Sequence, residues 1–167
     1  MATLTKTEQQ YTSKNTSINS TRLPVVYNKV NWNFFRDKIL LDVGAGKYTE
    51  HIKKFLEPYG IYYVPYDPYN CTAEENLYAS SIVPDVIVCS NVFNVIKEQD
   101  LIYELYDMIT AFDIPFFITV YEGDKSWIGR ETKKDCWQRN QNIDAYIFDW
   151  RDEVKHGVIT RHVHCVY

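Results

Sequence analysis

The residues best placed to do chemistry in this chain start with an acidic residue and two glycines. Asp42 follows the apolar run 39–41, and Gly44 and Gly46 come after it at alternate positions. Apolar side chains then recur over 48–59 at the spacing of one helix face. This order predicts a buried strand, a tight glycine turn and a helix. In such a unit the glycines let the backbone approach a ligand beside the helix N-terminus.

A second carboxylate follows the next apolar run. Asp67 lies 21 residues after Gly46, at the end of a strand predicted over 61–67. A carboxylate in that position can accept hydrogen bonds from both hydroxyls of a ribose. The alternative is a turn-forming aspartate, because Pro68 follows it directly.

Two features of the glycine turn argue against a dinucleotide such as NAD. Thr49 stands at the third glycine position of the Gly-x-Gly-x-x-Gly pattern, and Asp42 would place a negative charge beside the pyrophosphate. A carboxylate there suits a ligand that carries an ammonium or sulfonium cation. The two glycines can also serve only the geometry of a strand-to-helix connection.

Polar side chains also follow two later apolar runs, 86–89 and 114–121. Three come after the first run and two after the second: Ser90, Asn91, Asn94, Glu122 and Asp124. Hydroxyl and amide groups there can orient a nucleophile, and a carboxylate can accept its proton. Either asparagine can equally cap the helix that follows.

The stretch 125–139 carries five Lys or Arg residues against two acidic ones, with Trp127 and Trp137 among them. Basic and aromatic side chains together can bind phosphate and stack a base. The candidate substrate-binding residues in and beside this stretch are Asp124, Arg130, Lys133, Lys134 and Arg139. A solvated helix face is the alternative explanation of the charges. The whole chain has a net charge of -4, so a nucleic-acid site must be a local basic patch.

The elements that must position these residues form an α/β domain. Apolar runs alternate with helical patterns, which predicts a mainly parallel central sheet covered on both faces. Strands are expected near 39–41, 61–67, 86–89 and 114–121, helices over 49–59 and 97–112, and a closing antiparallel hairpin from 145–150 and 158–166. Ligands bind beyond the carboxyl ends of the strands in such sheets, so the polar strand ends are expected to meet in one site.

The segments outside this pattern are short or polar. Residues 1–22 can bury little and are expected to form a mobile tail, a loosely docked arm or a lid, while 23–167 forms the single domain. A short helix or turn is expected over 23–35, against the sheet edge. The link 71–81 has room only for a small element, and 125–142 is expected to be partly helical.

Composition is typical of a soluble protein in a reducing compartment. Hydrophobic residues make up 46% and charged residues 24%, and neither a signal peptide nor a run of membrane-spanning length is seen. We therefore expect a cytoplasmic protein without membrane contact. Cys89 is expected to be a buried thiol. His162, His164 and Cys165 lack the spacing of a zinc site, so no metal is expected.

Several of these features together resemble class I S-adenosylmethionine-dependent methyltransferases. The likeness covers 39–166 and rests on Asp42-x-Gly44-x-Gly46, Asp67, Asn91 and the final hairpin. It implies a Rossmann-like fold and S-adenosylmethionine as the cofactor. The glycine turn would then line the methionine and ribose, and Asp67 would hold the ribose hydroxyls.

The resemblance also implies a set of residues around the cofactor and the reacting group. The cofactor set is Asp42, Gly44, Ala45, Gly46, Tyr48, Asp67, Pro68, Ser90, Asn91 and Val92. The candidate catalytic residues are Asn91, Asn94 and Glu122. Tyr48 stands in place of the family's third glycine, which leaves less room at the turn.

A second likeness is to small methyltransferase-like proteins of phages and mobile elements. It rests on 121–124 together with Lys133, Lys134, Gln138, Arg139 and Asn140. The implied activity is methyl transfer, with a nucleic acid or nucleotide as the first expected acceptor and a small metabolite as the second. The Asn/Asp-Pro-Pro-Tyr and Pro-Cys motifs of base methylation are absent. Another S-adenosylmethionine- or nucleotide-using enzyme and a non-catalytic binding protein stay open as alternatives.

Overall fold

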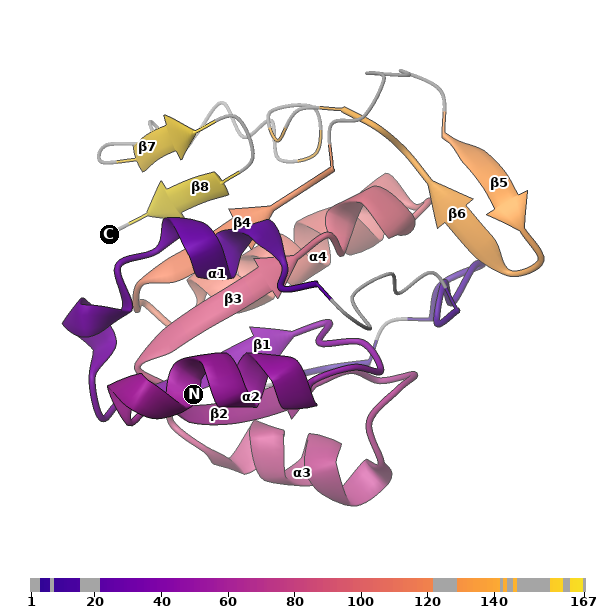
Figure 1. The fold of residues 1–167 in the computed structure, drawn as a ribbon. Helices are drawn as coiled ribbons and strands as arrows, with labels where there is room; N and C mark the ends of the chain where they lie inside the picture. The colour runs from indigo at the N-terminus through magenta and orange to yellow at the C-terminus, as the bar shows by residue number, and fades with distance from the viewer. Residues whose placement is uncertain are drawn as a thin grey trace.

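Six strands form the main sheet of the protein, in the order β2-β1-β3-β4-β8-β7 (Figure 1). The computed structural model describes residues 4–6, 8–15, 22–121, 129–141, 143, 146, 157–160 and 163–166. The strands of this sheet are β1 (Ile39–Val43), β2 (Tyr62–Tyr66), β3 (Val86–Ser90), β4 (Phe116–Thr119), β7 (Gly157–Thr160) and β8 (Val163–Val166). β1 to β4 run parallel, whereas β8 is antiparallel to both β4 and β7. The predicted α/β class, mainly parallel sheet and closing antiparallel pair are confirmed.

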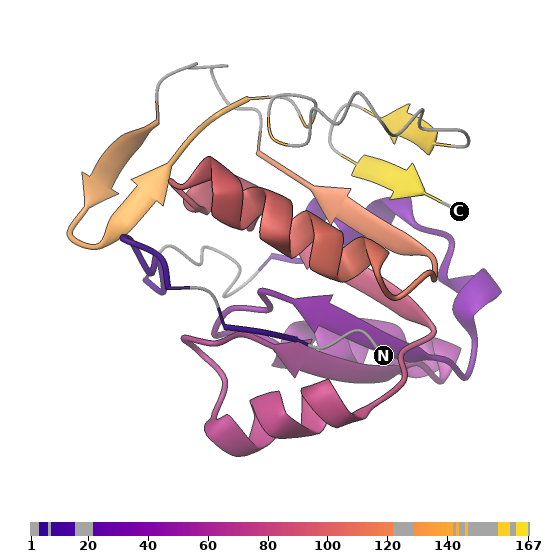
Figure 2. The ribbon, with the colours of Figure 1, turned by 180° about the vertical axis from the view of Figure 1, so that it is seen from behind.

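Helices cover both faces of the sheet. Those in the described chain are α1 (Val25–Lys29), α2 (Glu50–Leu56), α3 (Ala73–Ser81) and α4 (Gln99–Thr110). Successive side chains of a strand point to opposite faces, so Leu40 packs with α1 and α2 while Leu41 packs with α3 and α4. Figure 1 looks onto the face with α1 and α2, and Figure 2 looks onto the opposite face, with α4 in front.

Two elements differ from the sequence prediction in size or place. α3 has nine residues and fills most of the link 71–81. A capping box stabilises its start, in which Thr72 Oγ1 accepts from Glu75 N at 3.1 Å and Glu75 Oε2 accepts from Thr72 N at 2.7 Å. The segment 23–35 covers a sheet face rather than an edge. Its Trp32 is buried with its ring centroid 6.1 Å from that of Phe117 on β4.

The stretch 125–142, expected to be partly helical, contains a second, antiparallel pair of strands. These are β5 (Arg130–Lys133) and β6 (Cys136–Gln138). β5 is exposed along its whole length, so its charged residues give no apolar periodicity from which a strand can be predicted. Within the described residues β7 pairs with β8, so an antiparallel pair lies within 157–166. Of the first strand expected for the closing hairpin, 145–150, residues 145 and 147–150 lie outside the described part.

Part of the polar N-terminal segment contacts the domain. Leu4 is buried in the core cluster between the sheet and α3 and α4, and Ser13 is also buried. Of the forms expected for 1–22, the docked arm fits residues 8–15, while residues 1–3, 7 and 16–21 lie outside the described part. Among the helices of the described chain, none has the length and apolar character needed to cross a membrane.

Candidate functional site

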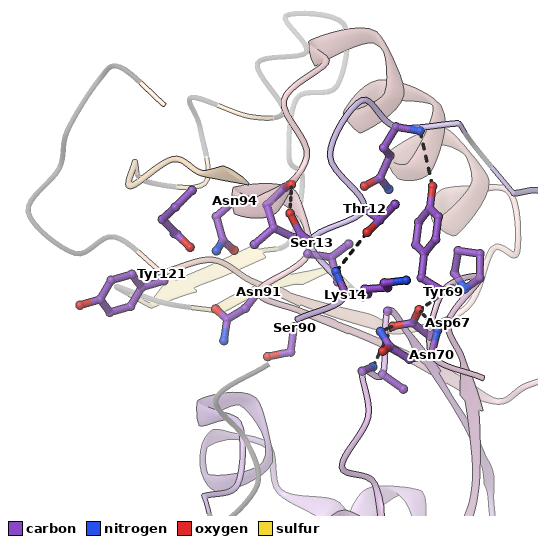
Figure 3. Close-up of a pocket in the computed structure, with 18 of the residues that line it drawn as sticks. Thr12, Ser13, Lys14, Asp67, Tyr69, Asn70, Ser90, Asn91, Asn94 and Tyr121 are labelled. Atoms are coloured by element: carbon purple, nitrogen blue, oxygen red, sulfur yellow. Dashed lines mark hydrogen bonds between the residues drawn. The ribbon is translucent and has the colours of Figure 1, made fainter. Parts of the chain in front are cut away.

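The strand order creates a site at one edge of the sheet. From β1 the chain passes first to β2 on one side and later to β3 on the other, so a crevice forms beyond the carboxyl ends of β1 and β3. A cavity of about 520 Å³ lies there (Figure 3). The strand ends supply Gly44, Ala45, Gly46, Asp67, Pro68, Tyr69, Asn70, Ser90, Asn91, Val92, Asn94, Val95 and Tyr121 to its walls.

The glycine turn packs closely against the loop after β3. Gly44 has a φ of +77°, and its amide donates to Tyr66 O at 2.7 Å. A Cβ atom at this position would lie 2.3 Å from Val92 Cγ2. Glycine is therefore required both by the left-handed backbone and by the contact that joins the two loops at the cavity floor.

Asp67 ties the turns after β1 and β2 together. The residue is 7% exposed, and its Oδ2 accepts from Gly46 N at 2.9 Å and from Asn70 Nδ2 at 3.1 Å. Its Oδ1 accepts from the amides of Tyr69 and Asn70 at 2.8 and 2.9 Å. These four bonds occupy the acceptor sites of a carboxylate. Asp67 therefore has the turn-forming role that the sequence offered as the alternative. A ribose hydroxyl would reach its carboxylate by displacing the side-chain amide of Asn70.

Asp42 lies behind the cavity rather than in its wall. Its Oδ2 accepts from Tyr27 Oη at 2.9 Å and from Tyr63 Oη at 2.6 Å, on the face covered by α1 and α2. Burial raises the pKa of Asp42 to about 6, although both tyrosine hydrogen bonds act to lower it. From this position the carboxylate faces Tyr27 and Tyr63 and does not line the cavity.

The loop after β3 brings hydroxyl and amide groups to the cavity. Ser90 Oγ lies 2.8 Å from Thr119 Oγ1, and Asn91 has a φ of +58° with its amide bonded to Thr119 O. Asn94 is 2% exposed, and its Oδ1 has no hydrogen-bond partner among the residues that the structure describes. Neither asparagine caps α4, whose N-cap is Glu98. A buried amide oxygen without a partner in a cavity wall is suited to accept a hydrogen bond from a ligand.

The N-terminal segment forms one wall of the cavity, which sequence reasoning missed. Thr12, Ser13 and Lys14 line it (Figure 3). Gln9 also lines it, together with Arg130, Gln138 and Asn140 from the region of β5 and β6. Ser13 Oγ donates to Val95 O at 3.1 Å and accepts from Trp137 N at 3.1 Å. Its amide also donates to Asp135 O at 2.9 Å. No local pattern in this polar segment signals these long-range contacts.

Several residues expected at the site lie outside the cavity walls. Tyr48 is 44% exposed and does not narrow the cavity, and Lys133 and Lys134 are exposed on and after β5. Arg139 is held by Gln141 and, at 3.0 Å, by Gln99 Oε1. Glu122 and Asp124 lie outside the described residues, as does His162. Within the described part of the chain, no three His, Cys, Asp or Glu side chains gather to hold a metal ion.

Removing the Ser13 hydroxyl is expected to loosen this wall. In Ser13→Ala the amide of Trp137 and the carbonyl of Val95 both lose their partner. The loss should lower the free energy of local opening by about 1–2 kcal/mol. Hydrogen exchange at the Trp137 amide should therefore become roughly 5–30-fold faster.

Ser80→Ala is the matched control, because that hydroxyl donates only to Asn76 O within α3. It should leave exchange at Trp137 unchanged. Unaltered protection of Trp137 in Ser13→Ala would contradict the docking of this segment.

No protein-family model matches the chain, and no curated protein or solved structure matches it.

Proposed function

We propose that the protein binds S-adenosylmethionine in the cavity at the carboxyl edge of the sheet and transfers its methyl group to a nucleic acid or nucleotide. The observation that carries the proposal is the cavity beyond β1 and β3, with the Gly44–Gly46 turn and Asp67 along the same wall. Its volume of about 520 Å³ falls within the range of small-molecule sites. The sequence resemblance to class I methyltransferases supports the same cofactor.

The cofactor would lie across the turns that Asp67 joins. By the resemblance, its ribose is placed beside Asp67 and its methionine part toward Ser90 and Val92. Gly44 and Gly46 both have a positive φ, and because glycine has no side chain they leave this wall open to a ligand. Asn70 would rotate away from Asp67 as the ribose hydroxyls take over its hydrogen bond.

Methyl transfer in this site would depend chiefly on positioning. Asp67 is the one carboxylate among the described residues of the cavity wall, and its oxygens already accept four hydrogen bonds. Ser90, Asn91 and Asn94 offer hydroxyl and amide groups that can hold an acceptor in line with the methyl group. A general base, where the acceptor needs one, is proposed at Glu122, which follows Tyr121 of the wall.

A binding protein without catalysis is the second candidate. The engagement of Asp67 by four groups of its own chain favours it, because a ribose must compete for that carboxylate. Another enzyme that consumes S-adenosylmethionine or a nucleotide would use the same cavity.

Incubation with methyl-labelled S-adenosylmethionine tests the proposal, with DNA, RNA, mononucleotides and small amines offered as acceptors. We expect label in a nucleic acid or nucleotide. Asn94→Ala should lower the rate on the order of 10–100-fold, because an acceptor loses its orienting partner. Asn28→Ala, at an exposed position of α1, is the matched control and should be fully active.

Label in none of the acceptors, from a protein that binds the cofactor, would contradict methyl transfer and favour the binding protein. Label confined to the small amines would contradict the proposed acceptor class.

A further inference from the structure

Lysine side chains from distant parts of the chain meet at Asn15, the residue after Lys14 of the cavity wall. Lys47 Nζ donates to Asn15 Oδ1 at 2.6 Å, and Lys133 Nζ donates to Asn15 O at 2.7 Å. Lys47 directly follows the glycine turn, and Lys133 ends β5. Two oxygens of one neutral residue therefore hold two ammonium groups at the same place.

We propose that this place is a phosphate-binding site, formed by Lys47 and Lys133 with Lys14 beside them, for a phosphate group of the methyl acceptor. The inference rests on the proposed function and narrows its acceptor to a phosphate-bearing compound. The shared chemistry is a phosphate ester, whose source is either a nucleic-acid strand or a free nucleotide.

The surrounding charges support an anionic ligand. Lys14 and Lys134 both lie close enough to Asp135 to contribute to the lowering of its pKa, after the larger effect of its hydrogen bonds from Thr12. Arg130 lines the cavity nearby. The cations of this region are Lys14, Lys47, Arg130, Lys133 and Lys134, against the anions Asp67, Glu131 and Asp135. This local excess of positive charge contrasts with the net charge of -4 of the whole chain.

None of these cations forms an ion pair within the part of the chain that the structure describes, where the ion pairs are Lys38–Asp85 and Lys53–Glu50. An ammonium group carries three N–H donors, so each bond to Asn15 leaves two for a ligand. A phosphate between Lys47 and Lys133 would accept from both and screen their mutual repulsion.

The position of the lysines also fits the acceptor's path. Lys14 lines the cavity, and Lys47 is the residue after Gly46 of its wall. A phosphate held by Lys47 and Lys133 would leave the rest of a nucleotide free to enter the cavity toward Asn94. The N-terminal segment would then take part in acceptor binding as well as in closing the cavity.

Binding of a fluorescent single-stranded oligonucleotide, measured by anisotropy over a series of salt concentrations, tests the site. The double variant Lys47→Gln/Lys133→Gln should weaken binding about tenfold or more. It should also reduce the slope of log affinity against log salt by roughly 0.7, because the contacts with one phosphate are lost. The control variant Lys29→Gln/Lys54→Gln changes the net charge by the same amount at exposed positions of α1 and α2. It should leave the affinity and the salt slope unchanged.

Competition by a mononucleotide separates the two sources of phosphate. Displacement at concentrations similar to those of the oligonucleotide supports a free nucleotide, and failure to displace supports a strand. Equal weakening by both double variants, or no binding of either probe, would overturn the phosphate site. S-adenosylhomocysteine is titrated into the same samples: if it binds while both probes fail, the phosphate site falls and the cofactor site stands.

Discussion

Asp67→Ala is expected to destabilise the protein by roughly 3–5 kcal/mol and to weaken cofactor binding by tenfold to a hundredfold. The substitution removes a buried carboxylate that accepts from Gly46, from the amide of Tyr69 and twice from Asn70. Those donors would be left without partners, and the turns after β1 and β2 would no longer be tied together. Urea unfolding and titration with S-adenosylhomocysteine measure the two effects.

Asp85→Ala is the matched control for this experiment. Its carboxylate also accepts a backbone amide, that of Ile39 at 2.9 Å, but at the opposite end of β1. It should cost about 1–2 kcal/mol of stability and leave cofactor affinity unchanged. An Asp67→Ala protein with wild-type stability and wild-type affinity would contradict the role assigned to Asp67.

Asp42→Asn is expected to change how stability depends on pH. The folded protein holds the pKa of Asp42 at about 6, mainly through burial, against 3.8 for a solvated aspartate. The folded state therefore binds this proton more tightly than the unfolded state. The resulting stabilisation is complete below about pH 4 and is lost as the pH rises through 6.

This difference corresponds to about 2.5 kcal/mol between pH 4 and pH 7. The free energy of unfolding of Asp42→Asn minus that of the wild type should increase by this amount over that range, as measured by urea unfolding. Tyr63→Phe removes a hydrogen bond that lowers the pKa of Asp42, so its transition should move to higher pH. Parallel pH profiles for Asp42→Asn and the wild type would show that the carboxylate is not buried as described.

The elements that sequence predicts well are those with a continuous apolar run or a one-sided helical face. β1 to β4 and α4 are of this kind, because the spacing of their apolar residues indicates which side chains are buried. α3 has no such face: Leu77 is exposed, and its start is signalled only by the spacing of Thr72 and Glu75. β5 is likewise exposed throughout, so backbone pairing rather than apolar spacing defines it.

The candidate site follows from sequence where parallel strands bring their ends together. Gly44, Asp67 and Ser90 line one cavity for that reason. The sequence also predicts Asp42 at this site, but alternation along β1 turns its side chain to the face of the sheet where Tyr27 of α1 bonds it. The hydrogen bonds of the Ser13 hydroxyl join it to residues 82 and 124 positions away, and local spacing cannot predict such contacts.

Calorimetric titration of the wild-type protein with S-adenosylhomocysteine, S-adenosylmethionine and NAD tests the cofactor site most directly. The proposed site predicts that the first two bind in the micromolar range, one per chain, and that NAD does not bind. Binding of NAD alone, or of none of the three, would contradict the proposed cofactor.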